Sequence, residues 1–274
     1  MSYRLGCCIP GASFMPQTGG EGARALDSLR AGYRRITGLG YDFAEATVGT
    51  LTALDGQELE QARGEGMRFE VCNSFVPPAY AFAVTADDAL YEFAKNAMRI
   101  MADMGTQYVI LGSGAARAVP KELAAADKYK RLADFLRICS NLYGEYGVTT
   151  VLEPLNAKET NCVNNVSEGY ALVAELALDG VMLLADAYHM HEQHEPVSVL
   201  SDCCAKLAHI HVSEPDRGAP GTGDDSWLEE FAAQLKKTAY NGRVSVECVF
   251  TPGGFERESA CALGAVKRIF NDLT

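Results

Sequence analysis

The sequence predicts a (β/α)₈ TIM barrel in one domain, and three observations support this. The 274 residues are close to the roughly 250 that such a barrel needs. Short β-branched or apolar runs alternate with longer amphipathic stretches, which is typical of a parallel sheet covered by helices. No linker, low-complexity tract or change of composition divides the chain, so we expect a single domain over residues 1–274.

The strand-like runs determine where the chemistry of such a fold would lie. Eight runs are predicted as strands, at residues 5–9, 41–46, 68–72, 108–111, 149–152, 181–185, 208–211 and 244–247. A doubly wound sheet with more strands is the alternative. That alternative is weakened because Gly6 and Gly11 flank the first run at the wrong spacing for a dinucleotide-binding turn.

The helices are predicted from apolar residues that recur on one face. Within residues 126–146, Leu132, Phe135, Leu136 and Cys139 follow a helical period. A second helix is predicted over residues 85–104, with Thr85 as its cap and two aspartates in its first turn. Three more helices are predicted at residues 167–178, 226–238 and 255–273.

Composition and charge exclude several classes of partner. The formal net charge of −12 disfavours nucleic acid and anionic membranes, which are bound by clustered Lys and Arg. No apolar run reaches the roughly 18 residues that cross a bilayer. The first residues have no charged-then-apolar leader, so we expect a cytoplasmic protein that acts on a small molecule, as a monomer or a homo-oligomer.

The nine cysteines include no C-x-x-C pair, and their number is odd. Several lie inside apolar runs. We therefore expect buried free thiols in a reducing compartment rather than disulfides or a structural zinc site.

Ionisable side chains stand at the ends of the last four predicted strands: Glu153, Asp186, His211 and Glu247. The carboxyl ends of barrel strands meet at one mouth, where the chemistry of such folds takes place. Three carboxylates and one imidazole would repel one another unless a cation lay between them. This oxygen-rich set suits Mn²⁺, Mg²⁺ or Co²⁺ better than structural Zn²⁺, which prefers thiolates. The sequence predicts one divalent metal ion on these four residues.

Other polar residues near the mouth have two readings each. His189, His191 and His194 could form a second metal cluster, but exposed loop histidines are common. His209 lies two residues before His211 and should point the same way, as an interior histidine below the metal. Glu45, after the second predicted strand, either lines the mouth or serves in a cap or salt bridge.

The late-strand motifs also carry a family resemblance. They read Glu153-Pro-Leu-Asn156, Asp186-Ala-Tyr-His189, His209-Ile-His211-Val-Ser213-Glu214-Pro-Asp216-Arg217-Gly218, and Val246-Glu247. On these motifs the sequence resembles the sugar isomerase/epimerase superfamily of xylose-isomerase-like barrels, and most of all the ketose 3-epimerases of the tagatose/psicose type. The likeness covers most of the chain in length and strand order, although its specific motifs lie between residues 150 and 250.

The resemblance implies a role for each matching residue. Glu153, Asp186, His211 and Glu247 would bind the metal, Mn²⁺ first and Mg²⁺, Co²⁺ or Zn²⁺ as alternatives. Glu153 and Glu247 would also be the catalytic acid and base on opposite faces of the substrate. The remaining roles concern substrate binding: His189 and Arg217 would contact substrate oxygens, and Glu159 would help to hold His189.

The implied reaction is epimerisation of a ketose by proton transfer through an enediolate, which the metal would stabilise. Ketose 3-epimerases often place tryptophans against the sugar, whereas the only tryptophan here, Trp227, lies in a predicted outer helix. The substrate is therefore left open.

Four other functions are weighed against this one. A hydroxypyruvate- or sugar-phosphate-type isomerase would use the same metal site, and so would a lyase of the inosose or dehydroshikimate dehydratase type. A non-catalytic relative is disfavoured because all four predicted ligands are present. A zinc endonuclease for abasic DNA is disfavoured because every histidine lies at position 189 or beyond.

Overall fold

The computed structural model describes residues 2–10, 25–120 and 129–272. Eight parallel strands close into a barrel in the order of the chain, and β1 pairs with β8 through Leu5 and Val244. The predicted barrel is confirmed. The strands are β1 (Arg4–Cys8), β2 (Phe43–Thr47), β3 (Val71–Asn73), β4 (Tyr108–Leu111), β5 (Thr149–Leu152), β6 (Val181–Asp186), β7 (Leu207–Val212) and β8 (Arg243–Val246).

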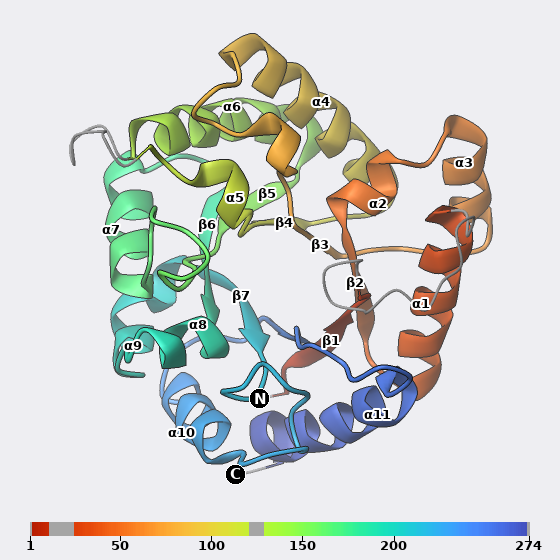
Figure 1. Ribbon diagram of the computed structural model, residues 1–274, viewed down its shortest axis with the longest axis vertical. Coiled ribbons are helices and arrows are strands. Elements are labelled where there is room, and N and C mark those ends of the chain that lie inside the picture. The colour runs from red at the N-terminus through yellow and green to blue at the C-terminus, as the bar shows by residue number, and fades with distance from the viewer. Residues whose placement is uncertain (1, 11–24, 121–128, 273–274) are drawn as a thin grey trace.

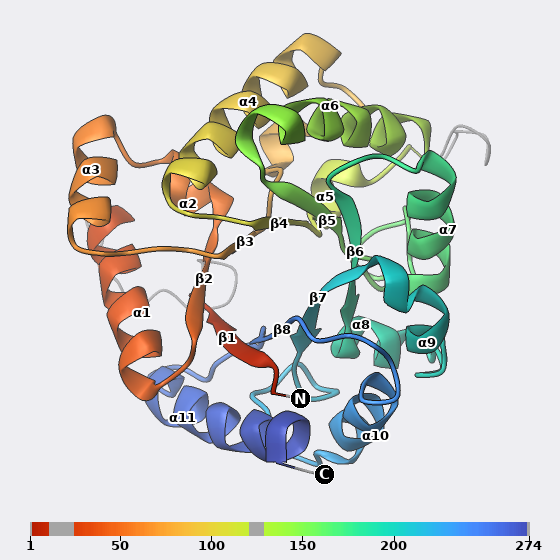
Figure 2. The same cartoon turned by 180° about the vertical axis from the view of Figure 1, so that it is seen from behind.

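Helices surround the barrel as an outer ring, seen from one end in Figure 1 and from the other in Figure 2. The longer ones are α1 (Ala25–Leu39), α3 (Gly56–Gly64), α4 (Asp87–Asp103), α6 (Lys130–Tyr146), α7 (Val166–Leu176), α10 (Ser226–Leu235) and α11 (Phe255–Val266). Short helices lie in the connections: α2 (Val48–Thr52), α5 (Gly114–Arg117), α8 (Ala187–Glu192) and α9 (Val199–Cys203).

The predicted helices differ in detail from the observed ones. Helix α4 is capped by Ala86 without a side-chain hydrogen bond, so the predicted Thr85 cap is wrong. The backbone N–H of Thr85 instead donates to Ala81 in a preceding turn, which moves the start of the helix by one residue. The start of the helix predicted over 126–146 lies outside the described residues. Helix α11 ends at Val266 and continues as a π-helical segment, Lys267–Asp272.

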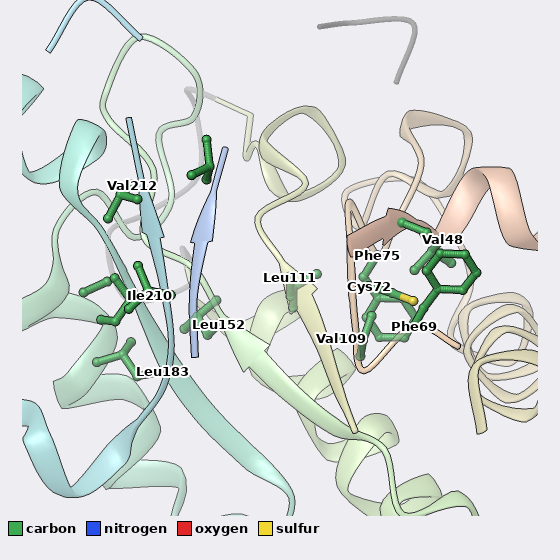
Figure 3. Packing of buried hydrophobic residues seen from close by; sticks show 14 of the residues in the cluster. Val48, Phe69, Cys72, Phe75, Val109, Leu111, Leu152, Leu183, Ile210 and Val212 are labelled. Atoms are coloured by element: carbon green, nitrogen blue, oxygen red, sulfur yellow. The ribbon is translucent and has the colours of Figure 1, made fainter. Parts of the chain in front are cut away.

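The strands separate two apolar regions, because successive side chains of a strand point to opposite faces. Val109, Leu111, Leu152, Leu183 and Ile210 belong to the large core between barrel and helices (Figure 3). The barrel interior holds a smaller cluster, made of Phe43, Val71, Ile110, Val151, Leu184 and Ala208.

The interior cluster determines what stands above it. Glu45, Glu153 and Asp186 each follow a member of that cluster by two residues, so they share its inward direction. The barrel is therefore apolar in its middle layer and ionisable in the next layer toward the mouth.

The opposite, amino-terminal end of the barrel is closed by a polar cluster. Arg243 Nε donates to Glu70 Oε2 at 2.9 Å and Arg243 Nη2 to Gln107 Oε1 at 2.7 Å. Arg4 adds an ion pair to the same glutamate, and the Arg243 guanidinium lies 5.0 Å from the centre of the Tyr108 ring. These contacts tie β1, β3, β4 and β8 together, so this end has a structural role.

Candidate metal centre at the barrel mouth

The four predicted ligands meet at one point of the mouth. One ligand atom from each of Glu153, Asp186, His211 and Glu247 lies within 4.8 Å of the others, and all four residues are buried. Asp186 ends β6, His211 lies in β7, and the two glutamates directly follow β5 and β8. The structure brings these residues together as the sequence predicts. Their role as metal ligands stays a prediction.

His211 lies between carboxylates on both sides of its ring. Its Nδ1 is 3.2 Å from Glu153 Oε1 and 3.4 Å from Glu247 Oε2, while its Nε2 is 3.0 Å from Glu45 Oε1. Burial lowers the pKa of His211, but the charges of Glu247, Glu45 and Glu153 outweigh it and raise that pKa well above its usual value. The carboxylates of the cluster thus stabilise a positive charge at its centre.

The donor set fits a divalent cation. Asp186 Oδ1 accepts the backbone N–H of Tyr188 at 2.7 Å, while Oδ2 is buried with no hydrogen-bond partner among the described residues. Burial and the Glu247 carboxylate raise the pKa of Glu153. An unpartnered buried oxygen and crowded carboxylates are expected of a site that a cation completes.

Glycine at position 112 gives Glu153 its place. A Cβ at Gly112, directly after β4, would lie 2.2 Å from Glu153 Oε2. Any larger residue at this position would force the Glu153 carboxylate to shift.

Arg217 reaches the cluster from a tight turn after β7. Its backbone N–H donates to Glu214 O at 2.8 Å, and its φ of 65° is left-handed, which costs an L-residue about 1–2 kcal/mol. The guanidinium lies 3.3 Å from Glu247 Oε2 and 3.3 Å from Glu159 Oε1, and 4.5 Å from the Tyr188 ring centre. Burial raises the pKa of Glu247, but His211 and Arg217 outweigh it and lower that pKa to about 2.

His189 is held beside Asp186 by Asn156. Its Nδ1 lies 2.9 Å from Asn156 Nδ2 and 3.2 Å from the Asn156 backbone nitrogen, both of which are donors. Nδ1 therefore accepts, and the ring proton belongs on Nε2, which lies 3.7 Å from Asp186 Oδ2. Glu159 is 4.0 Å from the ring and reaches it through Asn156, whose Nδ2 donates to Glu159 Oε1 at 3.1 Å.

The other histidines lie outside the four-residue cluster. His209 Nε2 lies 3.2 Å from Glu45 Oε2, one layer below the four-residue cluster. His191 packs on Trp227 with ring centres 5.4 Å apart, and neither His191 nor His194 belongs to a possible metal-binding group of described residues.

Sequence reasoning left three residues of the site without a firm role. Glu45 is fully buried and contacts both barrel histidines, Tyr188 lies under Arg217, and Asn156 orients His189. Tyr188 and Asn156 stand inside the quoted late-strand motifs, which could have indicated them. The only signal for Glu45 was its place as a charged residue within the apolar run of the second strand.

Comparison with known proteins places this site in a family. The model of the xylose isomerase-like TIM barrel family matches residues 34–262, which is most of the chain. The chain belongs to that family. The resemblance inferred from the late-strand motifs is thereby confirmed.

Two relatives found by sequence comparison are sugar epimerases by name. The D-psicose 3-epimerase of Agrobacterium fabrum is 21% identical over 252 residues, which cover 88% of this chain and 83% of that protein. The 3-dehydro-D-guloside 4-epimerase of Escherichia coli is 29% identical over 119 residues, which cover 43% of this chain and 45% of that protein.

Solved structures agree on the fold. A crystal structure of a D-psicose 3-epimerase in the presence of D-fructose superposes with a TM-score of 0.78 at 17% identity, covering 97% of this chain and 99% of that chain.

Two further expectations can be compared with the structure. All nine cysteines lie among the described residues, and all are free thiols, of which seven are buried. Within the described ranges, no helix has both the length and the apolar character to cross a membrane.

Proposed function

We propose that this xylose isomerase-like barrel is a metal-dependent sugar epimerase. It would invert one carbon of a ketose, for which we propose C3, by proton transfer through an enediolate. One observation carries the proposal. Glu153 and Glu247 each direct a carboxylate oxygen to the same buried cluster as Asp186 and His211. The names of the relatives support an epimerase, and the mouth of the barrel supplies the polar groups that a sugar would need.

Glu153, Asp186, His211 and Glu247 would hold one divalent ion, for which we propose Mn²⁺. When bound, that ion would polarise two neighbouring sugar oxygens and stabilise negative charge on them. It would also keep both glutamates ionised, so that each is ready to accept a proton.

The protein's own groups would then divide the work. One glutamate removes the proton beside the carbonyl, and the other returns a proton from the opposite face, so the configuration inverts. Arg217 and the Nε2–H of His189 point donors toward the cluster and would bind substrate oxygens. Glu159 and Asn156 would hold these two donors in place.

The test follows solvent hydrogen into the product. Manganese-loaded protein is incubated with D-psicose in D₂O, and deuterium at C3 is read by NMR for wild type, Glu153→Gln and Glu247→Gln. Both variants should retain metal, because an amide oxygen still coordinates, and both should lose net epimerisation. Glu256→Gln is the matched control, because that side chain is 73% exposed on the outer surface and should behave like wild type.

The outcomes separate the proposal from its alternatives. Each base faces one epimer, so one of the two variants should still exchange the substrate proton with solvent. Wild-type turnover without deuterium in the product would indicate a hydride-shift isomerase and defeat the two-glutamate mechanism. Exchange followed by loss of water and a new ultraviolet absorbance would indicate a lyase.

We further propose that residues 1–274 form one functional domain and that the chain acts alone or as a homo-oligomer on a small sugar. Measuring the mass of the active species in solution by light scattering tests the second point. An active species that contains a different protein would contradict it.

A further inference from the structure

Glu45 is a fully buried ionisable group of the mouth that the proposed reaction does not use. It stands on β2 and is 0% exposed. Its two oxygens contact two different imidazoles of β7: Oε1 lies 3.0 Å from His211 Nε2, and Oε2 lies 3.2 Å from His209 Nε2. A carboxylate in a dry interior is costly unless such partners satisfy it, so this placement needs an explanation.

The contact with His211 has a direction. Because Glu45 occupies the Nε2 edge of the ring, the Nδ1 edge faces Glu153 and Glu247, at 3.2 Å and 3.4 Å. Carboxylate oxygens can only accept, so Glu45 keeps a proton on Nε2, and a divalent ion bound at Nδ1 would displace the proton that faces Glu153 and Glu247. A ring turned over about its Cβ–Cγ bond would lose this bond and place the carbon Cδ2 where Nδ1 now faces the two glutamates.

We propose that Glu45 is a positioning residue that holds His211 with its Nδ1 lone pair toward the metal centre. This inference rests on the metal centre of the proposed function. Metal-binding histidines commonly donate their second ring N–H to a carboxylate, which fixes ring orientation and raises ligand basicity. Glu45 does so from across the barrel, three strands away from β7 through β1 and β8.

His209 has a different part in the arrangement. It contacts the second oxygen of Glu45, and its own Nδ1 is buried with no hydrogen-bond partner among the described residues. Removing His209 leaves the bond between Glu45 and His211 in place. His209 therefore offers a matched control from the same buried layer.

The experiment measures Mn²⁺ affinity directly, from the free Mn²⁺ signal in electron paramagnetic resonance. Glu45→Met removes the acceptor at similar volume and should weaken binding about 100-fold, the upper end for loss of such a partner. Glu45→Gln keeps an acceptor oxygen and should restore affinity to within about tenfold of wild type. His209→Gln should bind within about threefold of wild type. Melting of the metal-free proteins reports any general loss of structure.

A second measurement needs no variant. In zinc-loaded wild type, the histidine ¹H–¹⁵N spectrum should show His211 protonated on Nε2 and coordinated through Nδ1. The reverse assignment would overturn the inference even if Glu45→Met does not fold. So would a folded Glu45→Met protein with wild-type affinity, or equal losses in Glu45→Met and His209→Gln. If the wild-type protein binds no Mn²⁺, both this inference and the metal centre are overturned. If it binds Mn²⁺ normally but exchanges no deuterium, only the proposed reaction is contradicted.

Discussion

The loop that carries Arg217 contains a buried carboxyl group, and we predict that it makes stability depend on pH. Glu214 is 2% exposed; its Oε1 accepts the backbone N–H of Gly221 at 3.0 Å, and its Oε2 is buried without a partner among the described residues. Burial, together with nearby Asp225, raises the pKa of Glu214 to about 7. Between about pH 4.5 and pH 7, the folded protein therefore keeps the Glu214 proton, whereas the unfolded chain has lost it.

The size of the effect follows from the two pKa values. Glu214 titrates near 4.5 when unfolded and near 7 when folded. A tenfold difference in proton affinity is about 1.4 kcal/mol, so the full difference is at most about 3.5 kcal/mol. The proton on Glu214 contributes that stability fully below pH 4.5, and the contribution is lost as the pH rises through about 7.

Glu214→Gln tests this directly, because an amide stays neutral and its oxygen can still accept from Gly221. We expect the variant to exceed wild type by less than about 1 kcal/mol at pH 5 and by about 2–3 kcal/mol at pH 8 in the free energy of unfolding by urea. Glu256→Gln, on the exposed surface, should follow wild type at every pH. Parallel curves for wild type and Glu214→Gln from pH 5 to pH 8 would refute the reasoning.

Three more outcomes are expected. Chelation at neutral pH should lower the melting temperature by about 5–10 °C, compared with protein that has Mn²⁺ at 100 times its dissociation constant. Adding Mn²⁺ or Co²⁺ should restore the melting temperature, and unchanged melting after chelation would contradict a bound ion. Arg217→Lys should lower kcat/KM for D-psicose about 30- to 100-fold, the equivalent of about 2–3 kcal/mol of charge-assisted hydrogen bonds, while Arg257→Lys, 81% exposed at its side chain, should not. Ellman's reagent should label one thiol rapidly in native protein, because Cys261 alone among the nine cysteines is exposed, and Cys261→Ser should abolish that fast phase.

The sequence predicted the barrel and the meeting of the four late-strand residues because both depend on local pattern. An apolar run that ends in an ionisable residue fixes the strand and its mouth end at once, and β4 and β5 begin and end at the predicted residues. Barrel closure then brings successive strand ends together without any further information from side chains.

Glu45 could not be assigned in this way. Its two partners lie 164 and 166 residues further along the chain, so no local spacing relates them. The Arg217 turn poses a similar problem, because its left-handed backbone depends on hydrogen bonds that the letters Asp-Arg-Gly do not specify. In both cases the missing information is tertiary.

These residues indicate a division of labour around the barrel. Strands β5 to β8 supply the groups proposed to act on metal and substrate, whereas β2 and the end of β4 shape them, through the Glu45 carboxylate and the space left by Gly112. Supporting positions of this kind have no chemical motif, since a glycine or a lone glutamate is common at strand ends. The recognisable motifs therefore lie in the second half of the chain, although the geometry that those motifs need is built in part by the first half.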